Sequence, residues 1–363
     1  MRVLSVVGAR PQFVKLAPIA AECARRDVDH RIVHTGQHYD RLLSDVFFAD
    51  LKIPAPDLHL GVGSGTHGQQ TGAMLGRLDE VLTGERPDWV LVYGDTNSTL
   101  AATLSAVKLG LPLAHVEAGL RSFNRAMPEE INRVATDHCA DLLLAPSQVA
   151  MDHLDREGLT ERSVLVGDVM VDILMMVRDG RIRTTTSATA AEATTPIFGE
   201  SKGDYSVATI HRAENTDDPR RLQAIIDSLA AVDHPVLLLA HPRLVERAGQ
   251  HDIPLRHGAI ELRDPLPYPE LIAAVAQSRG VITDSGGLQK EAFVLRVPCT
   301  TVRTETEWPE TTEGGWNVLV EPGPALPAAA SRKRPDPLVA TPYGSGHAAS
   351  AMLDALRAGR TRR

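Results

Sequence analysis

Carboxylate side chains follow two of the apolar runs in the first half of this sequence. Asp95 and Glu117 each come shortly after such a run, and Glu129 opens a stretch with the pattern of a helix, with Arg133 one turn further on. Neighbouring carboxylates can move protons to and from a substrate and can stabilise positive charge that develops during a reaction. Each also has a structural alternative, because an Asp after a strand often caps a helix and a Glu–Arg pair can be a simple ion pair.

Two cations lie near the beginning of the sequence. Arg10 and Lys15 follow the first apolar run, and Pro11 between them suits the first turn of a helix. Because the N-terminus of a helix attracts anions, an anion-binding role is open to both cations beside that of ordinary surface residues. No Gly-x-Gly-x-x-Gly run follows this first strand, so a nicotinamide cofactor is not expected.

The second half of the sequence repeats this arrangement with residues suited to anions. His211, Arg212 and His241 follow two apolar runs, and a Gly-rich turn, Ser285-Gly286-Gly287, opens a predicted helix. The backbone N–H groups of such a turn bind phosphate well. A single histidine at a strand end is often an ordinary surface residue, but the recurrence of these residues at equivalent positions predicts an anion site in this half.

Short apolar runs alternate with amphipathic stretches along most of the chain. Runs rich in Val, Ile and Leu are typical of buried parallel strands, and the longer stretches between them are typical of helices. The predicted strands are 3–7, 31–35, 88–93, 111–116, 141–145, 163–166, 205–210, 236–240, 259–262, 280–283, 299–302 and 317–320. Regular alternation indicates a doubly wound α/β fold, in which ligands bind beyond the carboxyl ends of the strands.

The alternation is interrupted at residues 183–196, where large apolar side chains are scarce. We interpret this stretch as a linker between two Rossmann-like domains, 1–175 with the carboxylates and 176–345 with the anion site. A last helix within 346–363 is expected to pack back on the first domain. A nucleoside diphosphate in a central cleft between two such domains fits both sets of residues. Two Rossmann-like domains that face a central cleft form a glycosyltransferase-B-like architecture.

The composition excludes several classes of protein. The chain has 363 residues and a formal net charge of -8, which argues against a nucleic-acid-binding protein. Its three isolated cysteines exclude a disulfide framework and a cysteine-based zinc site, and no metal is expected. The first residues lack the apolar core of a signal peptide and no apolar run is long enough to cross a membrane, so a cytoplasmic protein is expected.

The segments that carry the candidate residues together resemble the non-hydrolysing UDP-N-acetylglucosamine 2-epimerase family. They occur in the order of the family over about residues 1–320, and their combination is highly specific. The matching segments are Gly8-Ala9-Arg10-Pro11, Gly36-Gln37-His38, Val92-Tyr93-Gly94-Asp95-Thr96, His115-Val116-Glu117-Ala118-Gly119-Leu120-Arg121, Pro128-Glu129-Glu130-Ile131-Asn132-Arg133, His211-Arg212-Ala213-Glu214-Asn215 and Asp284-Ser285-Gly286-Gly287.

The resemblance implies inversion at C2 of the sugar in a UDP-sugar. Members of the family eliminate UDP across C1 and C2 to give 2-acetamidoglucal, and UDP then adds back while C2 is protonated on the other face. The C2 proton becomes acidic only as the C1–O bond weakens and positive charge builds on the ring, and carboxylates nearby can stabilise that charge and carry the proton. The implied partners are the UDP-sugar and UDP, with no cofactor and with a second copy of the chain in a homodimer.

The resemblance also assigns roles to single residues. It places Asp95, Glu117, Glu129 and His211 in catalysis. Among the substrate-binding residues that it implies, Glu291 would bind the ribose hydroxyls, and Leu271 would contact uracil through its main chain. The full set of implied substrate-binding residues is Arg10, Lys15, Arg133, Arg212, His241, Leu271, Ser285, Gly286, Gly287 and Glu291.

Two features depart from many members of the family. Trp308 stands where many members have an arginine that touches the diphosphate, and Arg303 is the candidate to replace its charge. The loop between Arg121 and Glu129 is short, as in the branch that acts on UDP-2,3-diacetamido-2,3-dideoxyglucuronate, which is the alternative substrate. A UDP-sugar-dependent glycosyltransferase of the same architecture is a further alternative, which the three carboxylates disfavour.

Overall fold

The computed structural model describes residues 1–37, 48, 51–182, 203–337 and 341–360. The chain forms two compact units, and each is described by itself. Unit 1 comprises Met1–Thr185 and Thr341–Arg363, and unit 2 comprises Thr186–Ala340. The linker predicted at 183–196 lies outside the described residues.

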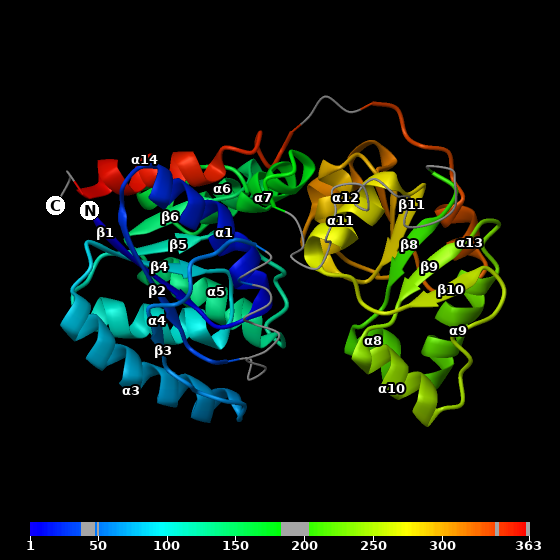
Figure 1. The fold of residues 1–363 in the computed structure, drawn as a ribbon, viewed down its shortest axis with the longest axis horizontal. Coiled ribbons are helices and arrows are strands. Elements are labelled where there is room, and N and C mark those ends of the chain that lie inside the picture. The colour runs from blue at the N-terminus through cyan, green and yellow to red at the C-terminus, as the bar shows by residue number, and fades with distance from the viewer. Residues whose placement is uncertain (38–47, 49–50, 183–202, 338–340, 361–363) are drawn as a thin grey trace. The chain divides into compact units, whose positions relative to one another are not determined.

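Unit 1 is built on a parallel sheet of seven strands in the order β3-β2-β1-β4-β5-β6-β7 (Figure 1). The strands are β1 (Arg2–Val7), β2 (Asp29–His34), β3 (Leu58–His59), β4 (Trp89–Tyr93), β5 (Leu113–Val116), β6 (Leu142–Ala145) and β7 (Ser163–Leu165). All six strands predicted in this half are confirmed. The sequence pattern does not predict β3, because its two residues are both exposed and form no apolar run.

Helices cover both faces of this sheet. Those of unit 1 are α1 (Arg10–Arg25), α3 (His67–Glu85), α4 (Asn97–Lys108), α5 (Pro128–Cys139), α6 (Gln148–Arg156), α7 (Val169–Arg178) and α14 (Ala348–Arg360), with a short 3-10 turn at Thr160–Arg162. Helices α1, α7 and α14 pack together on one face, and α3, α4 and α5 pack in a row on the other (Figure 1). One apolar core lies between β1 and β4 and the second group of helices, and Leu4, Val92, Leu78 and Ala102 are fully buried in it.

Unit 2 repeats this plan with a parallel sheet of six strands in the order β10-β9-β8-β11-β12-β13. The strands are β8 (Ser206–Thr209), β9 (Val236–Leu239), β10 (Ile260–Arg263), β11 (Gly280–Thr283), β12 (Cys299–Thr301) and β13 (Asn317–Leu319). All six predicted strands of this half are confirmed, and with unit 1 they establish the predicted α/β class with two parallel sheets.

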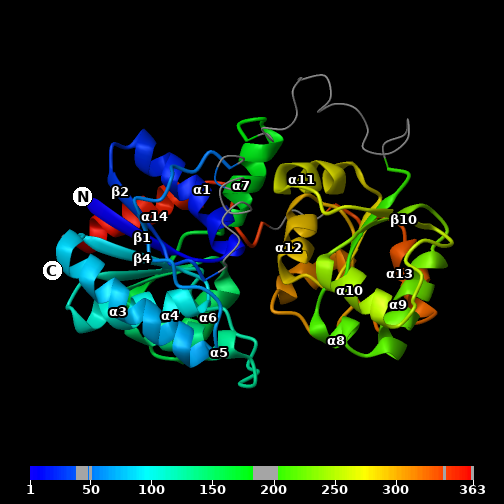
Figure 2. The same cartoon turned by 60° about the horizontal axis from the view of Figure 1, so that its bottom comes forward.

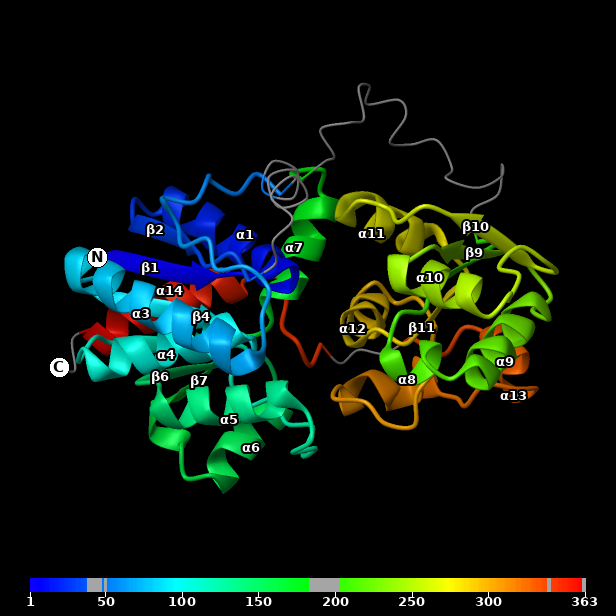
Figure 3. The same ribbon diagram turned by 90° about the horizontal axis from the view of Figure 1, so that it is seen from below.

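The helices of unit 2 form two apolar cores, one on each face of the sheet. They are α8 (Ala213–Thr216), α9 (Pro219–Ala230), α10 (Pro242–Gln250), α11 (Tyr268–Gln277), α12 (Gly286–Val294) and α13 (Ala325–Ala330), with a 3-10 segment at Pro309–Gly315. Helices α11 and α12 lie side by side (Figure 2), and α9 lies beside α13 (Figure 3).

The last helix of the chain, α14, belongs to unit 1. Asp172 of α7 accepts hydrogen bonds from the backbone N–H groups of Ala348 and Ala349, at 2.9 and 2.8 Å, and so caps the start of α14. Further along, Arg26 pairs with Asp354 at 2.5 Å. Within the described residues, no helix combines the length and the apolar composition needed to cross a membrane.

The capping contact of α14 generates a stability prediction. Replacing Asp172 by Ala leaves the two N–H groups without their acceptor, and loss of a capping side chain typically costs about 0.5–2 kcal/mol of stability. We expect Asp172→Ala to lower the midpoint of thermal unfolding measured by circular dichroism. Asp179→Ala, a change at an exposed carboxylate at the end of the same helix, is the control and should leave the midpoint nearly unchanged. Equal midpoints for the two variants would show that the cap does not hold α14.

Candidate active site

The two catalytic candidates Asp95 and Glu117 lie at the carboxyl ends of neighbouring strands. Strand β4 ends at Tyr93 and β5 ends at Val116, and the two strands pair in parallel. The backbone N–H of Gly94 donates to the carbonyl of Val116 at 3.1 Å, which keeps the two chain segments together beyond the sheet. The strand order of the sheet therefore brings together two carboxylates that are 22 positions apart in the sequence.

Glu117 has an unusual backbone and a charged partner. Its φ is 70°, in the left-handed region, where a residue other than glycine is strained by about 1–3 kcal/mol. Its carboxylate accepts a hydrogen bond from Lys15 Nζ, and both side chains are largely buried. The structure thus brings together two residues to which the resemblance gives separate roles, Lys15 as a substrate-binding cation and Glu117 as a catalytic carboxylate.

A fully buried aspartate of α5, Asp137, fixes the segment on either side of Glu117. Asp137 accepts from the backbone N–H of Gly119 at 3.0 Å and from Arg121 Nη1 at 2.7 Å. Its other oxygen lies 2.6 Å from Nδ1 of His115. These contacts hold the residues before and after Glu117 to one carboxylate, and they supply the support that the strained conformation needs.

The charge of Asp137 is compensated inside the protein. Burial alone would raise the pKa of this carboxyl group, but the His115 ring and the Arg121 guanidinium hold it below its ordinary value. The second ring nitrogen of His115 lies 2.7 Å from the carbonyl oxygen of Gly94, the residue before Asp95. His115 therefore links Asp137 to the turn that carries Asp95.

Asp95 pairs with a predicted substrate-binding residue. Arg133 donates to Asp95 through Nη2 and through Nε, the latter at 3.2 Å, and its Nη1 donates to Glu130 at 2.7 Å. Burial alone would lower the pKa of Arg133, but the charge of Asp95 raises it above its ordinary value. The structure therefore places Arg133 beside a catalytic candidate, with one side of its guanidinium held by a second carboxylate.

Glu129 and Glu130 are adjacent in α5 and have opposite environments. Glu129, the catalytic candidate, is exposed, and Glu130 is buried. Glu130 accepts from the backbone N–H groups of Ser122 and Phe123, at 3.0 and 2.9 Å. Burial raises the pKa of Glu130, but these hydrogen bonds and the charge of Arg133 hold it below its ordinary value. Glu130 thus anchors the short loop that precedes α5, and Glu129 faces solvent.

In unit 2 a second fully buried aspartate, Asp284, organises the predicted anion site. It follows β11 and accepts from the backbone N–H groups of His211 and Arg212, at 3.0 and 2.9 Å, and from Asn215 Nδ2 at 3.1 Å. Nδ1 of His211 also lies 3.2 Å from Asp284. The His241 ring packs against the His211 ring, with centroids 5.1 Å apart. The structure therefore brings His211, Arg212 and His241 together after β8 and β9.

The Gly-rich turn opens α12 at the same edge of the sheet of unit 2. Ser285 is the N-cap of this helix, and its hydroxyl accepts from the N–H of Leu288 at 3.4 Å. Gly286 and Gly287 form the first turn, and Glu291 is buried further along α12. Leu271 lies on α11, half-buried against the apolar core of that face.

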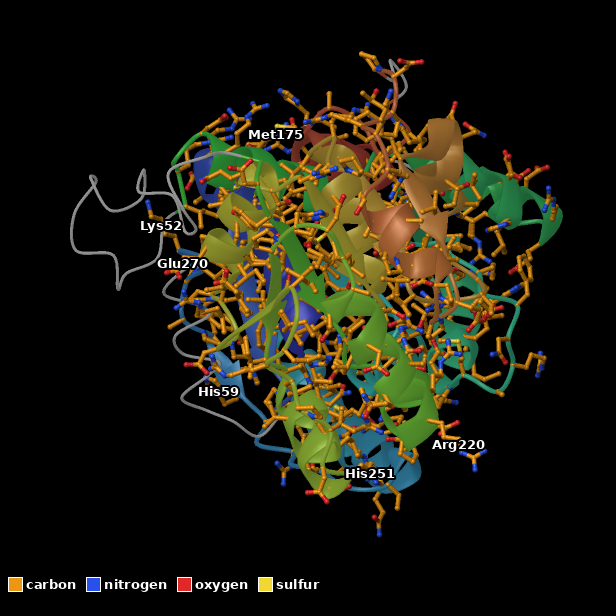
Figure 4. The ribbon with its side chains drawn as sticks, turned by 90° about the vertical axis from the view of Figure 1, so that its right-hand side faces the viewer. Lys52, His59, Met175, Arg220, His251 and Glu270 are labelled. Atoms are coloured by element: carbon orange, nitrogen blue, oxygen red, sulfur yellow. The ribbon has the colours of Figure 1, made fainter. Side chains whose placement is uncertain are left out.

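Some predicted residues and one surface hollow stand outside this arrangement. The side chain of Arg10 and all of His38 lie outside the described residues. A surface hollow in unit 2 is lined by Arg220 and Asp227 of α9 and by His251 after α10, and no predicted site residue lines it. Arg220 and His251 are labelled in Figure 4. Within the described part of the chain, no group of three or more His, Cys, Asp or Glu is arranged to hold a metal ion.

Four supporting residues were not predicted to have a role in the site: His115, Glu130, Asp137 and Asp284. Three of them lie within segments that match the family, but the segments alone do not show which polar side chain turns inward. The spacing of Glu130, Arg133 and Asp137 places these three charged residues on one face of α5. This spacing is the feature of the sequence that could have indicated a supporting role for Glu130 and Asp137.

The fold and these two groups of side chains define a parallel α/β enzyme of glycosyltransferase-B-like architecture. The same fold occurs in the glycotransferase of kitacinnamycin, with a TM-score of 0.56 at 14% identity over 99% of this chain and 95% of that one. The chain belongs to the UDP-N-acetylglucosamine 2-epimerase family, whose model matches residues 21–357.

Relatives and solved structures agree with this membership. The chain is 46% identical over 330 residues to UDP-2,3-diacetamido-2,3-dideoxy-D-glucuronate 2-epimerase of Pseudomonas aeruginosa, with 88% of each protein covered. It is 44% identical over 326 residues to a UDP-N-acetylglucosamine 2-epimerase homolog of Methanococcus maripaludis, again with 88% of each covered. The crystal structure of Methanocaldococcus jannaschii UDP-GlcNAc 2-epimerase in complex with UDP-GlcNAc and UDP matches with a TM-score of 0.86 at 37% identity, over 99% of this chain and 100% of that one.

The contacts of Asp284 generate a second stability prediction. In Asp284→Ala the backbone N–H groups of His211 and Arg212 and the side-chain amide of Asn215 lose their common acceptor. An unsatisfied buried polar group costs about 1–3 kcal/mol, so we expect a lower free energy of unfolding in urea. The control is Asp227→Ala on α9, where the side chain is 60% exposed and the change should be nearly neutral. If both variants unfold at the same urea concentration, Asp284 does not anchor the segment.

Proposed function

We propose that this protein is a non-hydrolysing UDP-N-acetylglucosamine 2-epimerase, which interconverts UDP-GlcNAc and UDP-ManNAc. The observation that carries the proposal is the placement of Asp95 and Glu117 after the ends of two neighbouring strands, with Glu129 exposed on α5. Membership of the family over residues 21–357 supports it. An epimerase needs groups that remove a proton from one face of C2 and return it to the other, and carboxylates can serve this purpose.

The reaction balances without a cofactor. The C1–O bond to UDP breaks as the C2 proton is removed, which leaves 2-acetamidoglucal and UDP. In the return step UDP adds to C1, and C2 receives a proton on the opposite face. We assign the proton transfers and the stabilisation of ring charge to Asp95, Glu117 and Glu129. Arg133 holds Asp95 in place, and Lys15 holds Glu117.

The nucleotide is assigned to unit 2. The turn Ser285-Gly286-Gly287 offers backbone N–H groups to the diphosphate, and His211, Arg212 and His241 lie after strands of the same sheet. We assign His211 to catalysis beside the diphosphate, because its ring is fixed against Asp284. Glu291 and Leu271 are proposed to bind ribose and uracil, and Arg10 to bind substrate, on the strength of the family resemblance.

The second candidate substrate is UDP-2,3-diacetamido-2,3-dideoxyglucuronate. The observation that favours it is the 46% identity to a Pseudomonas aeruginosa protein of that name, together with the short loop before α5. Parallel assays with the two UDP-sugars separate the candidates, since the better substrate is the one with the higher kcat/KM.

Two further properties are part of the proposal. We propose a homodimer, as expected from the family, and light scattering at micromolar concentration would measure its mass. We also propose a cytoplasmic location, which the free cysteines Cys23, Cys139 and Cys299 fit, because thiols stay reduced there. Fractionation of the source cells would test this location.

Proton NMR in deuterated water tests the proposed reaction. With UDP-N-acetylglucosamine alone we expect the manno epimer to appear with deuterium at C2, because the removed proton exchanges with solvent before its return. A glycosyltransferase would need an acceptor and would leave C2 protonated. Conversion without label at C2, or no conversion of either UDP-sugar, would contradict the proposal.

The carboxylates are tested by amide substitution. Asp95→Asn, Glu117→Gln and Glu129→Gln should each lower kcat by ~10²–10⁴, the usual cost of losing one acid–base group, while UDP binding measured by calorimetry persists. Glu80→Gln on the exposed face of α3 removes an equal charge and should keep wild-type turnover. Near-normal kcat in all three variants would remove these residues from the mechanism.

A further inference from the structure

A carboxylate of the protein occupies the start of α12, where the diphosphate is proposed to bind. The side chain of Glu307 lies so close to Gly286 that a Cβ atom at this position would collide with Oε1 of Glu307. Gly286 is the first residue of α12, a helix of nine residues. The unpaired N–H groups and the dipole of a helix N-terminus favour a negative charge at that place, whether it belongs to a ligand or to a side chain.

Two arginines hold this carboxylate. Arg303 Nη1 donates to Glu307 Oε2 at 2.7 Å, and Arg212 Nη2 lies 3.5 Å from Oε1. Burial alone would raise the pKa of Glu307, but the charge of Arg303 holds it below its ordinary value, so that Glu307 stays ionised. The carboxylate of Glu307 is thus surrounded by two arginines and a helix N-terminus, which are groups that also bind phosphate.

Arg303 also has unused binding capacity. Its side chain is only 6% exposed, and its buried Nε makes no hydrogen bond within the described part of the chain. The nearest carboxylate to Nε, that of Glu214, is 3.9 Å away, beyond hydrogen-bond distance. A buried donor without an acceptor is costly, and an incoming phosphate oxygen would remove that cost.

We propose that Glu307 is a resident anion that UDP displaces from the start of α12, and that Arg303 then binds the diphosphate together with Arg212. The inference rests on the proposed function only in taking UDP as the ligand. It gives Arg303 the role that the family resemblance implies for an arginine at the position of Trp308. UDP binding therefore breaks the ion pair between Arg303 and Glu307. Because this pair must be broken, the affinity for UDP is lower than it would be if both arginines were unpaired.

Calorimetric titration with UDP tests the exchange. Glu307→Gln keeps the shape of the side chain and removes the competing charge, so UDP should bind about three- to tenfold more tightly than to the wild type. Glu305→Gln is the matched control. Glu305 is exposed and lies two residues before Glu307, so this variant removes the same charge and should leave the affinity for UDP unchanged. Equal gains in both variants would indicate a general charge effect and would overturn the proposal. Unchanged or weaker binding to Glu307→Gln would also overturn it, because Glu307 would then only hold Arg303 in place.

Two further measurements cover the case in which Glu307→Gln does not fold. Arg303→Gln should weaken UDP binding by about tenfold or more, and wild-type affinity in this variant would remove Arg303 from the site. A crystal structure of the wild type with UDP should show Glu307 away from Gly286 and Arg303 on the diphosphate, whereas an intact Arg303–Glu307 pair beside bound diphosphate would overturn the displacement. All of these experiments measure UDP binding, so they keep their meaning even if the NMR assay detects no epimerisation.

Discussion

In each unit, one buried aspartate fixes the loop that follows a strand of the sheet. Asp137 in unit 1 and Asp284 in unit 2 are fully buried, and each accepts hydrogen bonds from backbone N–H groups of a loop that carries candidate catalytic residues. A buried carboxylate is costly unless charges and donors surround it, so it tolerates little change in the segments that supply them. The positions of Glu117 and His211 are therefore set by two acids that are themselves fully buried.

The same principle extends outward through paired charges. Glu130 holds the loop before α5 and Arg133, and Arg133 in turn holds Asp95. Arg133 is shared by Asp95 and Glu130, and Lys15 pairs with Glu117, so these three carboxylates each lie beside a positive charge. Such fixed charges need little rearrangement when positive charge develops on a substrate, which is how preorganised sites stabilise transition states.

The fold could be predicted largely from the sequence, because buried parallel strands are continuous apolar runs and each predicted run forms a strand. Strand β3 was missed, since pairing at the edge of a sheet requires no apolar run. The candidate residues Glu117 and His211 could be selected from the sequence because each comes at or just after the end of a strand. The partners were not predictable, because a pair such as His115 and Asp137 forms only when α5 packs beside β5, and because the choice between Glu129 and Glu130 depends on which face of α5 turns inward.

The position of α14 has a consequence for the order of events during synthesis. Unit 2 lies wholly between the two chain segments of unit 1, and the cap from Asp172 to Ala348 joins residues 176 positions apart. On the ribosome, every residue of unit 2 has been added before α14 exists. Unit 1 therefore cannot cover the surface of α1 and α7 with α14 until all of unit 2 has been synthesised.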